Sequence, residues 1–193
     1  MKRLITLFLV AAVTMFFYSC SENNSTAPEL SQSDQVTSTL AKVKTAFTGT
    51  CIPILLGDPG TKTVLPNGKT LVKGETAEWY DEADDWRVTG KTFWFINSLI
   101  EADGLNTKLW GKANIIVVGE NPGDDPRGTW NLSWRGYLTP KEDPPYNEYS
   151  HFTIVVDAVG QGKEGEVKGL VAKWTYKFDS EVGYFYVTEG FIH

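Results

Sequence analysis

The sequence predicts an all-β fold, a single antiparallel β-barrel of about eight strands, and three observations support this. Aromatic residues make up 13% of the 193 residues and include seven Trp, which is too much apolar bulk for a disordered chain. Eighteen Gly and nine Pro supply many turns. Apolar and polar residues alternate with a period of two in several runs, as in strands with one buried face. Short alternating runs in series, each followed by a turn, are typical of an antiparallel barrel or sandwich.

The first 19 residues have the composition of a secretion signal. Lys2 and Arg3 precede an apolar run that ends at Tyr18 and contains only two Thr. The run is short for a membrane span, and polar residues follow it at once. We therefore expect residues 1–19 to be a signal peptide and the protein to be exported.

The end of this segment, Phe17-Tyr18-Ser19-Cys20, resembles the lipobox of bacterial lipoproteins. In that family the cysteine receives a diacylglyceryl thioether and becomes the mature N-terminus. The resemblance implies lipid attachment at Cys20, with the membrane as a partner through this anchor. Ser21, in place of Asp, implies sorting to the outer membrane. Ordinary cleavage after Ser19 is the alternative.

Residues 20–44 are expected to be a flexible tether after the lipidated cysteine. Their first part, residues 21–28, is small and polar and has no periodicity. The barrel domain is expected over residues 45–193. Pro53 interrupts its first run, which indicates an edge position or a bulge. Strands are expected at residues 46–56 (broken at Pro53), 61–65, 70–75, 91–100, 109–118, 129–138, 152–158, 172–178 and 184–191.

The clearest alternation lies between Gly128 and Phe178. Large side chains there recur on the faces that should point into the barrel, where they either fill the interior or line a ligand cavity. The candidate cavity-lining residues are Trp130, Trp134, Phe152, Trp174 and Tyr176.

Acidic residues gather between residues 77 and 86. Ca²⁺ prefers several carboxylate oxygens, but the regular spacing and the glycine of a known calcium loop are missing, so a solvated acidic loop is the preferred interpretation. Trp79 and Trp86 flank this segment and are expected at the surface. The acidic residues are Glu78, Asp81, Glu82, Asp84 and Asp85.

The segment from Gly160 to Gly165 reads G-x-G-x-x-G and follows a strand. A dinucleotide site requires a helix to begin at these glycines, so that its amides hold a pyrophosphate. The residues that follow are β-branched, aromatic and interrupted by Gly169, which predicts a strand. We therefore expect a glycine-rich hairpin turn and no nucleotide.

Charge and residue counts exclude several functions. A net charge of −6 disfavours nucleic acid, which requires a basic face. The two histidines, His151 and His193, provide neither a zinc site nor a catalytic triad, so no metal and no cofactor is expected. Cys51 is expected to be a buried structural thiol. A carboxylate pair for glycoside hydrolysis stays possible because acids are plentiful.

An ordered series of glycine and tryptophan motifs resembles secreted bacterial proteins of unknown function that follow the allene oxide cyclase-like and dirigent-like barrel pattern. The resemblance covers residues 45 to 193. It implies an eight-stranded barrel around an apolar cavity, with no cofactor, and it carries over no catalytic residue. The motifs lie at residues 85–90, 109–113, 128–136, 158–162, 169–176 and 190–192.

These observations predict a lipid-anchored protein of the bacterial outer membrane. Its expected role is non-enzymatic binding of a small apolar or aromatic ligand, or a structural role at the surface. The alternative is a cofactor-free cyclase- or isomerase-like enzyme, or a carbohydrate-active one. A binding barrel should have a cavity lined by Trp and Phe, and an enzyme should add a titratable group with a perturbed pKa inside it. A fully packed interior would favour the structural role over both.

Overall fold

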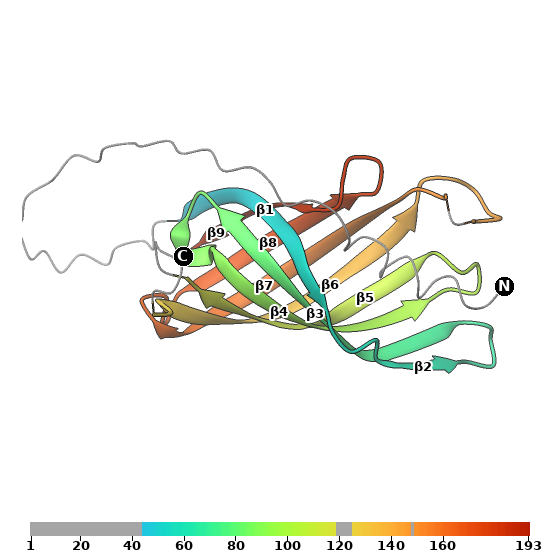
Figure 1. Ribbon diagram of the computed structural model, residues 1–193, viewed down its shortest axis with the longest axis horizontal. Coiled ribbons are helices and arrows are strands. Elements are labelled where there is room, and N and C mark those ends of the chain that lie inside the picture. Colours follow the sequence, from blue (N-terminus) through green and yellow to red (C-terminus); the bar gives the residue numbers. More distant parts are fainter. Residues whose placement is uncertain (1–43, 119–124, 148) are drawn as a thin grey trace, which may run out of the picture.

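A computed structural model describes residues 44–118, 125–147 and 149–193. This part of the chain forms nine antiparallel strands and one short 3-10 helix, η2 (Figure 1). Eight strands close into a barrel and β2 is an additional strand, which confirms the predicted fold class. The elements are β1 (Thr45–Leu56), β2 (Thr61–Val64), β3 (Thr70–Ala83), η2 (Trp86–Val88), β4 (Gly90–Ile100), β5 (Thr107–Val117), β6 (Gly128–Pro140), β7 (Phe152–Gly165), β8 (Val171–Asp179) and β9 (Tyr186–Ile192).

The barrel is closed by β1, which pairs with β9 on one side and with β3 on the other. From β3 to β9 each strand pairs with the next along the chain, and β2 pairs with β3 alone. Closure removes the exposed edges that an open sheet would present. In the β1–β3 ladder the register shifts between Pro53 and Leu55, so the expected bulge at the proline is confirmed.

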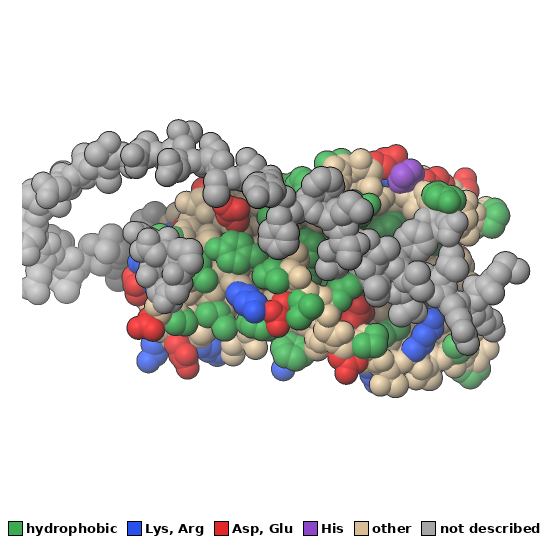
Figure 2. Space-filling model, viewed as in Figure 1, with side chains coloured by type: hydrophobic (Ala, Val, Ile, Leu, Met, Phe, Trp, Pro, Cys, Tyr) green, Lys and Arg blue, Asp and Glu red, His purple; other side chains and the backbone are tan. Residues whose placement is uncertain are grey.

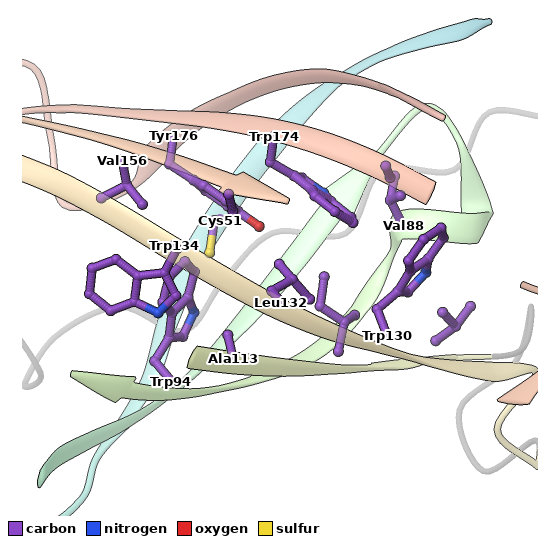
Figure 3. Packing of buried hydrophobic residues seen from close by; sticks show 14 of the residues in the cluster. Cys51, Val88, Trp94, Ala113, Trp130, Leu132, Trp134, Val156, Trp174 and Tyr176 are labelled. Atoms are coloured by element: carbon purple, nitrogen blue, oxygen red, sulfur yellow. The ribbon is translucent and has the colours of Figure 1, made fainter. Parts of the chain in front are cut away.

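The core lies inside the barrel because every second residue of each strand points inward. The alternation predicted between Gly128 and Phe178 is confirmed: Trp130, Leu132 and Trp134 are buried, and the residues between them face outward. Figure 3 shows large rings from β4, β6 and β8 meeting across the interior. Four buried Trp pack edge to face in two pairs, Trp94 with Trp134 at 5.2 Å and Trp130 with Trp174 at 5.4 Å between ring centroids.

One end of the barrel is closed by side chains. Val88 of η2 and Val167 of the β7–β8 turn are fully buried there, together with Trp130. The indole Nε1 of Trp130 donates a hydrogen bond of 2.7 Å to the carbonyl oxygen of Arg87, which fixes η2 across this end. The Arg127 guanidinium lies 3.4 Å from the centroid of the Trp86 ring and pairs with Glu166, so the closed end is also covered from outside.

The glycines of the G-x-G-x-x-G segment differ from the prediction in their position. Gly160 and Gly162 lie within β7, and the turn follows Gly165 instead of including them. The neighbouring side chains require small residues here, because a Cβ on Gly160 would lie 2.6 Å from the Trp174 ring. Strand β8 follows the turn, so the predicted absence of a helix at these glycines is confirmed.

Gly111 of β5 makes a similar close approach. A Cβ at this position would lie 1.8 Å from the backbone oxygen of Phe95 and 2.9 Å from the Trp134 ring. We expect Gly111→Ala to lower the free energy of unfolding by about 2 kcal/mol through overpacking, measured by urea denaturation. Lys112→Ala, on the outer face of the same strand, is the control and should change stability little. Equal stability of both variants would contradict this account.

The outer face of the barrel is mixed in character. Figure 2 shows hydrophobic side chains interspersed with acidic and basic ones on the face in view. Exposed apolar residues such as Phe95, Trp110 and Tyr137 lie on strands that also present Lys91, Lys108 and Arg135. Among the described residues, the structure contains no helix with the length and apolar character needed to span a bilayer.

Candidate functional site at the open end of the barrel

The end opposite η2 carries inward-facing aromatic residues that remain half-exposed. Phe152 and Phe178 stack with their ring centroids 5.7 Å apart, and Phe178 lies 5.3 Å from Tyr186. Tyr186 in turn contacts Trp79 edge to face at 5.1 Å. These four rings come from β3, β7, β8 and β9, so they form an aromatic rim along one side of this end. We call it the open end, in contrast to the closed end at η2.

The exposure of the interior tryptophans differs between the two ends. Trp130, next to η2, is 0% exposed, whereas Trp94 and Trp134 retain 8% and 6%. A depression of about 500 Å³ lies beside the aromatic rim and includes the inward-facing Thr107 and Leu138 in its wall. Another of about 280 Å³ lies on the outer wall, against Ile52 and Phe185. Both depressions are open surface features, and the first of them lies at the end of the barrel opposite η2.

A polar group lies in the middle of the barrel, between the rim and the closed end. Asp81 of β3 is 3% exposed, and its Oδ2 accepts a hydrogen bond from the Thr92 hydroxyl of β4. Cys51 of β1, the register partner of Asp81, is buried beside it. Tyr176 of β8 reaches in from another wall, and Figure 3 shows its hydroxyl beside the Cys51 sulfur.

The electrostatics of this group follow from its burial. Loss of solvation raises the pKa of Asp81 to about 6, and the hydrogen bond from Thr92, together with the nearby Cys51 thiol and Tyr176 hydroxyl, offsets part of this effect. Burial, together with the nearby Asp81 charge, raises the pKa of the Cys51 thiol and of the Tyr176 hydroxyl well above their ordinary values. The thiol is therefore protonated and unreactive at neutral pH, as expected for a buried structural cysteine.

Several buried polar atoms near this level have no hydrogen-bond partner within the described part of the chain. One is Oδ1 of Asp81, and the others are the Tyr176 hydroxyl and the indole nitrogens of Trp94, Trp134 and Trp174. The Tyr176 hydroxyl and Asp81 are close enough to affect each other's pKa, although their geometry falls short of a good hydrogen bond. Buried polar atoms in folded proteins are seldom left unpaired, so this group has capacity to bind a polar ligand atom.

The candidate cavity residues all face the interior, but they lie at different depths. Trp130, Trp174 and Tyr176 are buried in the packed core, and Trp134 is nearly so. Phe152 lies in the aromatic rim and is half-exposed.

The acidic segment differs from the prediction of a solvated loop. Residues 78 to 83 belong to β3, and Asp81 points into the barrel, whereas Glu82 faces solvent. Trp79 likewise points inward against Tyr186 instead of lying at the surface. A weak signal was present, because Ala77, Trp79, Asp81 and Ala83 form one alternating face.

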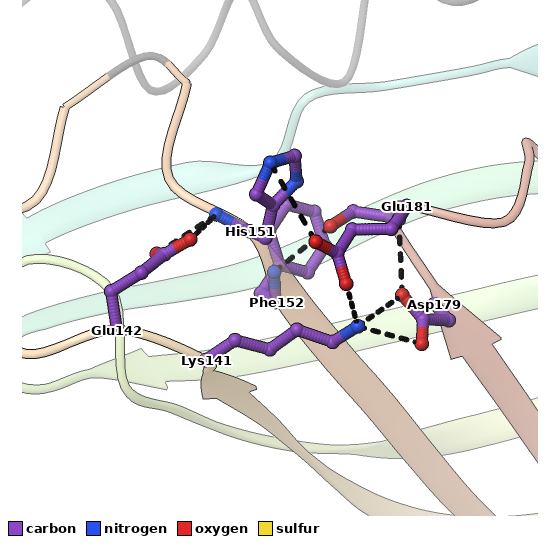
Figure 4. A network of polar contacts seen from close by, with 7 residues as sticks. Lys141, Glu142, His151, Phe152, Asp179 and Glu181 are labelled. Atoms are coloured by element: carbon purple, nitrogen blue, oxygen red, sulfur yellow. Dashed lines mark hydrogen bonds and ion pairs between the residues drawn. The ribbon is translucent and has the colours of Figure 1, made fainter.

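A network of ion pairs connects two loops beside the aromatic rim (Figure 4). The ammonium of Lys141 bonds both carboxylate oxygens of Asp179, at 2.7 and 2.8 Å, and also contacts Glu181. Glu142 accepts from the backbone N–H of His151 at 2.9 Å, and His151 lies 3.9 Å from Glu181. The network therefore joins the loop before β7 to the turn after β8.

Within the part of the chain that the structure describes, no cluster of ligating side chains suited to a metal ion is found. Cys20 and the predicted signal and tether lie outside the described residues, except for Lys44 at the end of the tether. Comparisons of this chain with protein-family models, with curated proteins and with solved structures find no match.

Proposed function

We propose that this barrel binds a small apolar or aromatic molecule at its open end, and that the protein is exported and held at the bacterial outer membrane by a lipid on Cys20. The observation that carries the binding proposal is the difference between the two ends. Side chains seal one end, while four aromatic rings remain half-exposed at the other. Eight-stranded barrels are wide enough to hold one small ligand, and aromatic walls favour apolar guests.

A second candidate is an enzyme without a cofactor. The specific observation in its favour is Asp81, a carboxyl inside the barrel whose pKa of about 6 suits proton transfer near neutral pH. Binding is preferred as the primary function because Asp81 has no second catalytic group beside it among the described residues: the Cys51 thiol and the Tyr176 hydroxyl both have their pKa raised well above the ordinary value and stay protonated.

Binding is tested with the neutral dye N-phenyl-1-naphthylamine, whose fluorescence rises in apolar surroundings. We expect saturable binding with one site per chain, weakened about tenfold by Phe178→Ala, which removes a ring from the rim. Phe95→Ala removes the same ring from the outer face of β4, where it is 48% exposed and lines neither depression, and should leave the affinity unchanged. Absence of saturable binding, or equal losses in the two variants, would refute binding at the open end.

The anchor is tested separately by mass spectrometry of the protein isolated from its native membrane. We expect a diacylglyceryl group on Cys20 and no residue before it. An unmodified N-terminus at another position would refute the anchor and leave the binding proposal standing.

A further inference from the structure

Two inward-facing acids of β3 have no cationic partner among the described residues. Asp81 is surrounded by Cys51 from β1, Thr92 from β4 and Tyr176 from β8, none of which carries a positive charge. Glu75, nearer the open end, is partly buried, and its pKa is raised by loss of solvation. It is close enough to raise the pKa of the Tyr186 hydroxyl. The approach to the interior is therefore electrostatically negative.

The unpaired charge is the costliest of the unsatisfied groups in this region. A buried neutral N–H without a partner, such as the indole of Trp94, costs about 1–3 kcal/mol. A buried carboxylate without a cation costs more, because charged groups lose far more solvation energy than neutral ones. A ligand therefore gains most if it brings a positive charge to Asp81, whose Oδ1 still lacks a hydrogen-bond donor.

The aromatic rings between the open end and Asp81 favour the same charge. Trp79 lies two residues before Asp81 on the inward face of β3, and it packs against Tyr186. Tyr176 and Trp94 meet edge to face at 5.3 Å at the level of Asp81. Ring faces attract organic cations, most strongly where water is excluded, and they also bind an apolar ligand body.

We propose that the open end selects small organic cations, whose ammonium group pairs with Asp81 while their apolar body lies among Trp79, Tyr186 and Phe178. This inference rests on the proposed function and adds the charge of the ligand. The ammonium N–H donates to Oδ1 of Asp81, and Glu75 attracts the cation at the entrance. The Trp79 and Tyr186 rings separate to admit it, so binding changes tryptophan fluorescence. Anions are repelled by both acids and by the net charge of −6.

Three probes that share one ring system test this selectivity by calorimetry on the full chain near pH 8. They are the 1-naphthylmethylammonium ion, neutral 1-naphthalenemethanol and anionic 1-naphthoate. We expect the ammonium to bind at least about tenfold more tightly than the alcohol, and the carboxylate most weakly. Asp81→Asn should reduce the affinity for the ammonium probe to the affinity for the alcohol. Glu82→Gln, which removes the next acid of β3 from the outer face, should preserve the difference.

The pH provides a second readout that requires no variant. Lowering the pH to about 5 protonates Asp81, so the advantage of the ammonium over the alcohol should shrink several-fold. Equal affinities of ammonium and alcohol near pH 8 would overturn the inference and leave the proposed function intact. A preference for ammonium that survives in Asp81→Asn would overturn the role of Asp81. If no naphthalene probe binds, the proposed function and the inference both fail.

Discussion

Raising the pH from about 4 to about 8 is expected to remove about 3 kcal/mol of folding free energy through Asp81 alone. The carboxyl has a pKa of about 6 in the folded barrel against an ordinary value of 3.8, a difference of roughly two units. Between these values the folded state binds more protons than the unfolded state, so stability falls as the pH rises. The contribution is complete below about pH 4 and is lost as the pH passes 6.

The measurement is urea denaturation of the natural protein and of Asp81→Asn across this pH range. Asn keeps the size of the side chain and can accept from the Thr92 hydroxyl, but it does not ionise. The stability difference between the two proteins should therefore shift by about 3 kcal/mol in favour of the variant as the pH rises.

Subtracting the two curves removes the contributions of the other acids. Several of these act in the opposite direction, because the pKa values of Asp103 and Asp179 are lowered by hydrogen bonds that stabilise the charged form. The outward-facing Glu82→Gln is the matched control. Parallel curves for the natural protein and Asp81→Asn would show that the buried carboxyl does not titrate as described.

Replacing Trp130 with Ala is expected to cost about 4 kcal/mol of stability. The side chain is completely buried at the closed end, and removing a buried aromatic ring costs both its transfer free energy and the cavity left behind. The change also leaves the carbonyl of Arg87 without its indole donor, which adds to the loss. Urea denaturation at constant pH measures the effect.

Trp79→Ala is the comparison that separates the two ends of the barrel. This ring is half-exposed in the aromatic rim, so its loss should cost much less stability, about 1–2 kcal/mol, while weakening binding of the naphthylamine dye. Trp130→Ala should leave binding per folded molecule unchanged. Similar stability losses in the two variants would contradict the distinction between a packed end and an open end.

The fold could be predicted because the strongest strands alternate cleanly. Trp130, Leu132 and Trp134 lie two residues apart with polar residues between them, and this pattern admits only a strand with one buried face. A barrel could be expected, but the identity of the strands that close it, β1 and β3, could not be predicted, because these strands are not adjacent along a meander.

The buried polar group around Asp81 could not be predicted, for a different reason. Around Asp81 both faces of β3 carry acids, so the hydrophobic alternation that identifies a strand is lost, and an acidic run normally indicates a solvated segment. Burial of one carboxyl among Thr92, Cys51 and Tyr176 arises from three strands that meet only in the folded barrel. Sequence patterns within one segment cannot contain this information.

The direction of β1 sets which end of the barrel is attached when the molecule is held from its N-terminal side. Its first residues pack at the closed end, where Phe47 meets Trp174, and β1 then runs toward the aromatic rim (Figure 1). Any chain that precedes Lys44 thus joins the barrel at the sealed side. If residues 20–44 act as the expected flexible tether, a lipid attached upstream would hold the barrel by its sealed end and leave the aromatic rim unobstructed. The rim would then be free to meet molecules from the surrounding water as well as from the membrane surface.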